Sequence, residues 1–179
     1  MQTFCAHPRG WVLQALQAPF AYTGHIKRLI ARLKFGRQRW LGQVLGELLR
    51  PALVVGDYDL CVPVPLHTRR LAQRGFNQAQ EIAVGMAPAR AGMKLTRALQ
   101  RVRDTPPQTQ LGATERHNNL AGCFQVISTV ESLSILLVDD VVTTGSTMNT
   151  LAALLRDHGA CFVAGVAVAR TVAPYTAKV

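Results

Sequence analysis

The stretch that decides the fold is "SILLVDDVVTTGSTMNTLAALLRDHGA", which runs from Ser134 to Ala160. It opens with a continuous apolar run, which is typical of a buried β-strand. It closes with a helical pattern that places Met148, Leu151 and Leu155 on one side and stops at Gly159. A buried strand that leads into a helix predicts an α/β fold with a mainly parallel sheet covered on both faces.

The turn between this strand and this helix predicts a site for a phosphorylated sugar. Backbone N–H groups at a helix N-terminus favour an anion, and glycine permits a tight turn. The turn supplies hydroxyls and one glycine: Thr143, Thr144, Gly145, Ser146 and Thr147. The carboxylates of Asp139 and Asp140 only accept hydrogen bonds, so they suit the hydroxyls of a sugar, with a divalent cation as a third party. Either aspartate alone would more simply be a helix N-cap.

The other segments extend the alternation of strands and helices. Apolar runs at 58–66 and 161–170 predict two further strands. Helical patterns are expected at 25–35, 40–50 and 76–86, the last of them after a basic turn. Two prolines predict a long mobile loop at 102–111. We therefore expect one globular unit, with an N-terminal helical region at 1–55 and an α/β core at 56–179.

Composition narrows the class of protein. The chain has 179 residues, 49% of them hydrophobic, and no apolar run is long enough to span a membrane. The N-terminus shows no signal peptide, so a cytoplasmic protein is expected. Four widely spaced cysteines argue against a disulfide framework and an internal zinc site.

The net charge of +10 favours polyanionic partners such as nucleic acid or phosphorylated metabolites. A basic surface that serves only solubility is an equally good interpretation of the charge alone. The basic segments at 26–39 and 97–103, with Phe35, Trp40 and Phe76 as sparse stacking groups, would form the nucleic-acid surface.

The segment "ILLVDDVVTTGST", from Ile135 to Thr147, resembles the 13-residue signature that binds 5-phosphoribosyl-1-diphosphate (PRPP) in type I phosphoribosyltransferases. The segments "YTGHIKRLIARLKFG", "VPVPLHTRRLAQRGFNQAQEIA" and "DTPPQTQLGATERHNNLAGCF" resemble the ComF/GntX-like branch, which is associated with competence for natural DNA transformation. The resemblance implies the type I phosphoribosyltransferase fold, with a small N-terminal helical hood.

The resemblance also implies roles for single residues. Asp139 and Asp140 would bind the ribose hydroxyls, and the turn 143–147 would bind the 5-phosphate. The pyrophosphate would meet His67, Thr68, Arg69 and Arg70. Pocket support or a flexible closing loop would come from Arg74, Asn77, Gln78, Arg101, Arg103, Thr105 and Gln108. Mg²⁺ would accompany PRPP, with Asp139 or Asp140 as candidate ligands, and the sequence identifies no catalytic base.

One departure from the branch concerns zinc. Members commonly begin with a four-cysteine zinc ribbon, whereas this chain has only Cys5 with His7 nearby. These two residues cannot complete a tetrahedral site, so no zinc is expected here. We expect that Met1 lies downstream of the natural start.

Three functions stay open from the sequence. The first is transfer of phosphoribosyl from PRPP to a nitrogen acceptor with release of pyrophosphate. The second is a non-catalytic competence protein that senses PRPP and binds single-stranded DNA. The third, compatible with the second, is a partner subunit of a DNA-import machine. The acceptor and a homo-oligomeric state are not determined by the sequence.

Overall fold

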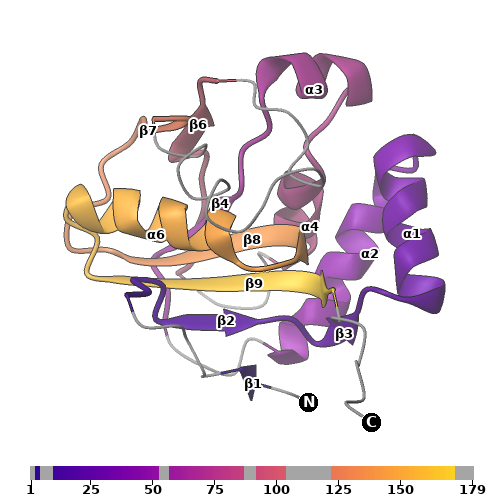
Figure 1. The fold of residues 1–179 in the computed structure, drawn as a ribbon, viewed down its shortest axis with the longest axis horizontal. Helices are drawn as coiled ribbons and strands as arrows, with labels where there is room; N and C mark the ends of the chain where they lie inside the picture. The colour runs from indigo at the N-terminus through magenta and orange to yellow at the C-terminus, as the bar shows by residue number, and fades with distance from the viewer. Residues whose placement is uncertain (1–2, 5–9, 53–56, 87–91, 104–121, 172–179) are drawn as a thin grey trace, which may run out of the picture.

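The computed structural model describes residues 3–4, 10–52, 57–86, 92–103 and 122–171. Their centre is a seven-stranded sheet with helices on both faces (Figure 1). The strand order is β1-β2-β9-β8-β4-β5, and β3 also pairs with β9. All pairs in this sheet are parallel except β1 with β2. The sheet strands are β1 Thr3–Phe4, β2 Ala15–Gln17, β3 Phe20–Ala21, β4 Leu60–Pro63, β5 Lys94–Leu95, β8 Ser134–Val142 and β9 Phe162–Arg170.

The two longest strands, β8 and β9, form the middle of the sheet. They pair in parallel from Ser134 opposite Phe162 to Val142 opposite Arg170. Their apolar side chains are buried on both faces, as in Leu137 and Val166. This double burial explains why both segments read as continuous apolar runs in the sequence.

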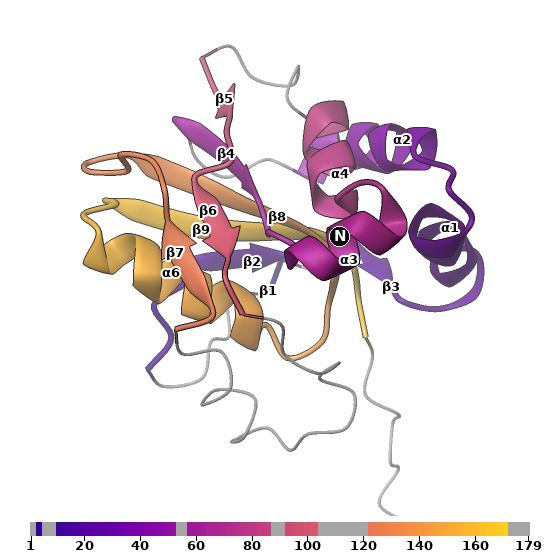
Figure 2. The ribbon, with the colours of Figure 1, turned by 90° about the horizontal axis from the view of Figure 1, so that it is seen from above.

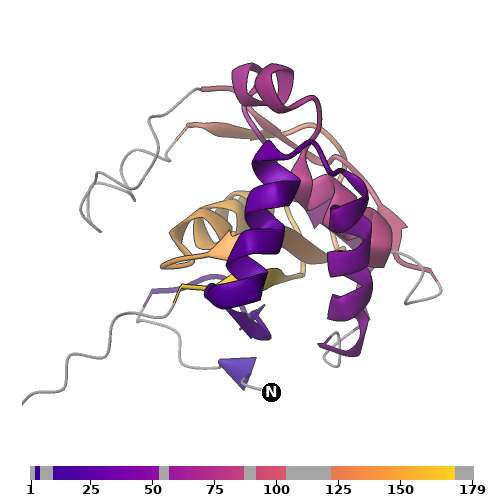
Figure 3. The same cartoon turned by 90° about the vertical axis from the view of Figure 1, so that its right-hand side faces the viewer.

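The helices lie in two layers (Figure 2). The helices are α1 Gly24–Phe35, α2 Trp40–Leu49, α3 Thr68–Arg74, α4 Gln78–Met86 and α6 Ser146–Asp157, with a short 3₁₀ turn at Arg50–Ala52. One face packs against α1, α2 and α4, and the other against α6 and a hairpin of β6 Leu99–Arg101 and β7 Phe124–Val126. Figure 3 looks onto α1, which runs from β3 toward α3.

Helices α2 and α4 approach each other unusually closely. A Cβ atom built on Gly46 would lie 2.1 Å from the carbonyl oxygen of Ile82, and one on Gly85 would lie 2.1 Å from that of Gln43. These two glycines therefore allow backbone-to-backbone contact between the helices. No helix of the described ranges is long and apolar enough to cross a membrane.

The expected α/β fold with a mainly parallel sheet and flanking helices is confirmed. Three details were wrong. Residues 1–55 are not only helical, because β2 and β3 join the central sheet. The expected basic turn after β4 is the helix α3, which His67 caps by accepting a hydrogen bond from the Arg69 N–H at 3.3 Å. Strand β8 continues to Val142, two residues beyond Asp140, where the sequence predicted its end. The boundary expected at 55 lies outside the described residues.

Candidate sugar-phosphate site

Two adjacent carboxylates lie near the carboxyl end of β8. Asp140 is buried, with 8% of its surface exposed, and Asp139 is half-buried. Asp139 Oδ1 accepts a hydrogen bond from the Asp140 backbone N–H at 2.8 Å. Because ligands of open α/β sheets bind beyond the carboxyl ends of the strands, this is the edge where a ligand is expected.

The electrostatics of this acidic pair are unusual. Burial raises the pKa of the Asp139 carboxyl well above its ordinary range, and the neighbouring charge of Asp140 raises it further. The positive charge of Lys34 acts in the opposite direction. Hydrogen-bond donors of a ligand, such as sugar hydroxyls, would therefore stabilise the negative charge of this pair.

Two cations approach Asp140 from separate helices. Lys34, at the end of α1, forms an ion pair with Asp140. Arg74, at the end of α3, lies over the Phe35 ring with 5.4 Å between its guanidinium carbon and the ring centroid. Burial lowers the Arg74 pKa, while the charge of Asp140 raises it, so these two groups also interact. The ends of α1, α3 and β8 thus meet at one point.

Sequence reasoning missed Lys34. The helical pattern of α1 places it among basic residues at the edge of the buried stripe, beside the fully buried Leu33. The available signal was its position in "YTGHIKRLIARLKFG", one of the segments that resemble the ComF branch.

The turn after β8 forms the start of α6 as predicted. Gly145 precedes the helix with φ 85°, and a Cβ atom there would lie 2.5 Å from Trp11 Cη2, so only glycine fits. The hydroxyls of Thr144 and Ser146 lie 2.6 Å apart, and Thr144 Oγ1 also accepts the Ser146 N–H at 3.3 Å. Thr143 and Thr144 are exposed. Hydroxyls and a helix N-terminus therefore face the same turn, an arrangement that suits phosphate.

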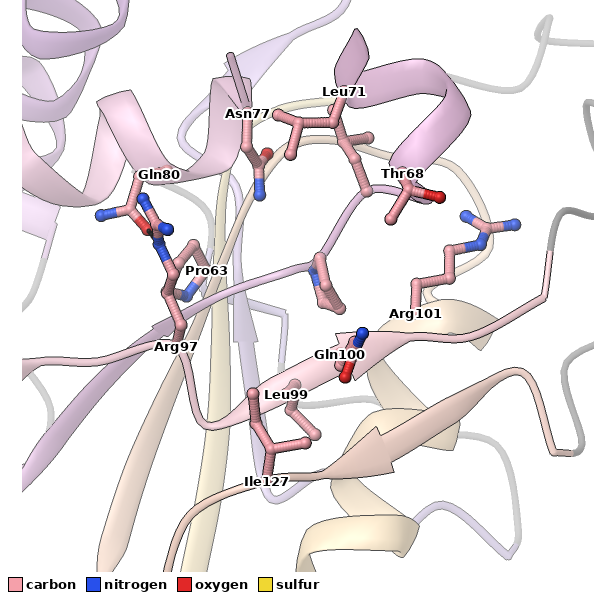
Figure 4. A pocket seen from close by; sticks show the side chains of 12 residues that line it. Pro63, Thr68, Leu71, Asn77, Gln80, Arg97, Leu99, Gln100, Arg101 and Ile127 are labelled. Atoms are coloured by element: carbon pink, nitrogen blue, oxygen red, sulfur yellow. Dashed lines mark hydrogen bonds between the residues drawn. The ribbon is translucent and has the colours of Figure 1, made fainter.

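The predicted pyrophosphate residues follow β4 and begin α3. Thr68 and Arg69 are exposed, and His67 and Arg70 are half-buried. His67 also makes a parallel bridge to Arg101, which links the start of α3 to the hairpin. A pocket of about 290 Å³ lies beside them, with Thr68 and Leu71 from α3 on one side and Leu99 and Arg101 from β6 on the other (Figure 4). This pocket is not lined by Asp139, Asp140 or the turn at 143–147, which we call the phosphate turn.

Some of the remaining predicted site residues lie within the part of the chain that the structure describes, and others lie outside it. Asn77 donates to the Val64 carbonyl at 3.0 Å and accepts the Ala79 N–H at 3.0 Å, so it fixes the start of α4 against β4. Gln78 is buried, and among the described residues its Nε2 has no hydrogen-bond partner. Arg101 lies over the Phe124 ring at 5.5 Å, and Arg103 is exposed. Thr105, Gln108, Cys5, His7 and nearly all of the loop expected at 102–111 lie outside the described residues.

Carboxylate oxygens are the ligands that Mg²⁺ prefers, so the acidic pair has the right chemistry for that ion. However, Asp140 is already paired with Lys34, and no cluster of three or more His, Cys, Asp or Glu residues occurs in the described part of the chain. The acidic pair could therefore supply only part of the ligand set of a Mg²⁺ ion.

Comparison with known proteins agrees with this geometry. The model of the phosphoribosyl transferase domain matches residues 70–177, a range that contains both carboxylates and the whole phosphate turn. The chain belongs to the phosphoribosyltransferase family. Within this family its curated relatives include DNA utilization proteins and competence proteins, which confirms the predicted ComF branch.

Three relatives illustrate the similarity. The DNA utilization protein YhgH of Salmonella typhi is 34% identical over 163 residues, which are 87% of this chain and 71% of the relative. Competence protein F of Haemophilus influenzae is 33% identical, with 77% of this chain and 65% of the relative covered. Competence protein ComFC of Streptococcus pneumoniae is 29% identical, with 89% and 72% covered.

Among solved structures, the allosteric regulatory enzyme of purine biosynthesis matches with a TM-score of 0.50 and 21% identity. The match covers 72% of this chain and 25% of that enzyme's chain. At this identity it supports the phosphoribosyltransferase fold and nothing finer.

Proposed function

We propose that this phosphoribosyltransferase-family protein binds PRPP at the end of β8 and serves in the uptake or use of DNA. The observation that carries the binding proposal is the adjacency of two carboxylates, Asp139 and Asp140, to the hydroxylated turn at 143–147. Ribose hydroxyls would donate to the carboxylates, and the 5-phosphate would accept from the turn. The names of the relatives support the link to DNA.

Binding would position the C1 carbon of PRPP near the start of α3. His67, Thr68, Arg69 and Arg70 would then receive the diphosphate, for which guanidinium groups are well suited. Mg²⁺ bound to the diphosphate would neutralise its charge, with Asp139 or Asp140 as a candidate protein ligand.

We further propose that the reaction, where an acceptor is available, is phosphoribosyl transfer. The bond between C1 and the diphosphate oxygen breaks, and its electron pair leaves with pyrophosphate. A nitrogen lone pair of the acceptor forms the new bond to C1, and the nitrogen proton is released to solvent. The protein would contribute by orientation and by charge stabilisation of the leaving group, which needs no protein nucleophile.

The test is calorimetric titration of PRPP with Mg²⁺ into the wild-type protein and into the Asp139→Asn/Asp140→Asn variant, with folding checked by circular dichroism. We expect saturable binding to the wild-type protein and its loss in the variant. Absence of binding to the folded wild-type protein would overturn the proposal. Release of pyrophosphate on addition of candidate amines would then separate turnover from binding alone.

A second candidate function is binding of single-stranded DNA, which would make the protein a PRPP sensor within a competence machine in the cytoplasm. Phe35 and Trp40 are 75% and 61% exposed and flank the exposed Arg37 between α1 and α2. Exposed aromatic rings next to cations are typical of surfaces that bind single strands. Phe76, in contrast, is buried and cannot stack on a base, which corrects the expectation from the sequence.

Fluorescence anisotropy with a labelled oligonucleotide tests this second function. We expect affinity that falls steeply as salt rises and that weakens in Trp40→Ala, because backbone contacts release counterions and stacking contributes per base. An unchanged affinity in Trp40→Ala would exclude this surface as the stacking site.

A further inference from the structure

The end of α1 reaches into the acidic pair of β8 in a defined position. The side chains of Lys34 and Asp140 are 20% and 12% exposed, so their ion pair is largely shielded from water. Ile30 and Leu33 anchor the same end of α1 in the core with no exposed surface. The approach of Lys34 is therefore fixed by helix packing and differs from a chance contact of a flexible surface lysine.

A second cation is influenced by the charge of the same carboxylate. Arg74 of α3 lies over the ring of Phe35, the residue next to Lys34, and this contact joins the ends of the two helices. The charge of Asp140 raises the Arg74 pKa, so these two groups interact electrostatically, and Lys34 already pairs with Asp140. Two cations from separate helices therefore act on this acidic pair.

A sugar phosphate that uses Asp140 must compete with Lys34. Ribose 5-phosphate offers only hydroxyls there, so displacing the ammonium would leave it without a counter-charge in a shielded place. PRPP carries a diphosphate on C1, the carbon next to the C2 hydroxyl. A lysine ammonium has three donors on a flexible stem, so it can move from Asp140 to diphosphate oxygens over a short distance.

We propose that Lys34 is a specificity-determining residue of this site: it pairs with Asp140 in the empty protein and contacts the C1 diphosphate of bound PRPP, which favours PRPP over ribose 5-phosphate. The inference rests on the proposed binding of PRPP to the same carboxylates. It assigns part of the site to α1, outside the strand, turn and loop segments that the sequence predicted.

The test compares the affinities of PRPP and ribose 5-phosphate, both with Mg²⁺, by calorimetry in three proteins. These are the wild-type protein, Lys34→Met, and the control Lys94→Met, which removes an exposed ammonium from β5. In Lys34→Met we expect the ratio of PRPP affinity to ribose 5-phosphate affinity to fall at least about tenfold, the effect of losing one charge-assisted contact. PRPP should bind more weakly, and ribose 5-phosphate equally or more tightly. Lys94→Met should keep the wild-type ratio.

The outcomes separate this inference from the proposed function. If the wild-type protein binds no PRPP, the proposed function itself fails. If it binds PRPP but Lys34→Met leaves the ratio unchanged, or weakens both ligands equally, Lys34 has no role in specificity. An equal fall in Lys94→Met would show only a general charge effect. Lys34→Arg, which retains a cation at this position, should restore most of the ratio and keeps the inference testable if Lys34→Met does not fold.

Discussion

The side-chain oxygen of Asn149 accepts the backbone N–H of Val12 at 2.8 Å and also that of Leu13 at 3.1 Å. This buried asparagine ties the segment before β2 to α6, the helix that begins at the phosphate turn. Asn149→Ala would leave two backbone donors unsatisfied, so we expect a loss of about 1–3 kcal/mol in the free energy of unfolding. Urea denaturation measures the loss. Thr150→Val is the control, because the buried Thr150 hydroxyl has no hydrogen-bond partner among the described residues and its removal should not destabilise the protein.

Replacement of Gly145 should damage the phosphate turn. Gly145→Ala places a methyl group against Trp11 at a residue whose φ is 85°, so both a clash and backbone strain oppose it. We expect at least about a tenfold loss of ribose 5-phosphate affinity by calorimetry. Gly92→Ala is the matched control, because Gly92 also has a positive φ but a Cβ atom there meets nothing within 4 Å. Its strain should lower stability and leave binding intact; an equal loss of binding in both variants would contradict the role of the turn.

Replacing either carboxylate of the pair by an amide should shift the thermal unfolding midpoint, and the two shifts should have opposite signs. The pKa of Asp139 is raised on folding, so the folded state holds this proton more tightly than the unfolded chain does. Its contribution to stability is present at low pH and is lost as pH rises from the ordinary carboxyl value through the raised one. Asp139→Asn should therefore raise the thermal unfolding midpoint, and by more at about pH 8 than at about pH 5.

Asp140→Asn should instead lower the midpoint, because it leaves the shielded ammonium of Lys34 without its counter-charge. Thermal scans of both variants at the two pH values give the comparison. A lower midpoint for Asp139→Asn at the higher pH would show that its negative charge is stabilised by the fold.

Close contact between α2 and α4 predicts a large effect of one methyl group. In Gly46→Ala the new Cβ would be more than about 1 Å inside ordinary contact with the Ile82 carbonyl, so the helices must separate. We expect a loss of about 1–3 kcal/mol, although alanine favours an isolated helix by up to about 1 kcal/mol. Urea denaturation gives the value, and Gln43→Ala, at an exposed position of α2, should change little. A stabilised Gly46→Ala would mean that the helices lie further apart than described.

The described cysteines should differ sharply in reactivity. Burial raises the pKa of the Cys61 thiol to about 12, so almost none of it is thiolate near neutral pH. Cys161 is exposed, with its sulfur 3.4 Å from the Ser134 hydroxyl. In a Cys5→Ser background, mass spectrometry after brief iodoacetamide treatment should find Cys161 alkylated and Cys61 unmodified. Rapid alkylation of Cys61 in the folded protein would contradict its burial.

The sequence predicted the middle of the fold because long periodic segments carry their own signal. Strands β8 and β9 are continuous apolar runs, and α6 has a clear buried stripe. Strands β2 and β3 were missed because three and two residues show no periodicity, and their pairing with β9 depends on a distant part of the chain. Helix α3 was missed because none of its residues is buried, so it has no apolar stripe to recognise.

The sequence also predicted only part of the candidate site. The acidic pair and the phosphate turn form one continuous segment, so the sequence identified Asp139, Asp140 and 143–147 together. Lys34 reaches the pair only through the packing of α1 against the core, and no spacing in the sequence encodes that approach. Residues that converge from separate elements need the folded structure to be found.

Strand β9 contacts β2, β3 and β8, yet it is the last element of the described chain to be synthesised. On the ribosome, β2, β3 and β8 cannot complete their pairing with β9 until Arg170 has emerged. Premature termination before this strand would therefore leave apolar strand edges exposed, a state that favours aggregation and degradation. The central sheet can therefore form completely only after β9 has been translated.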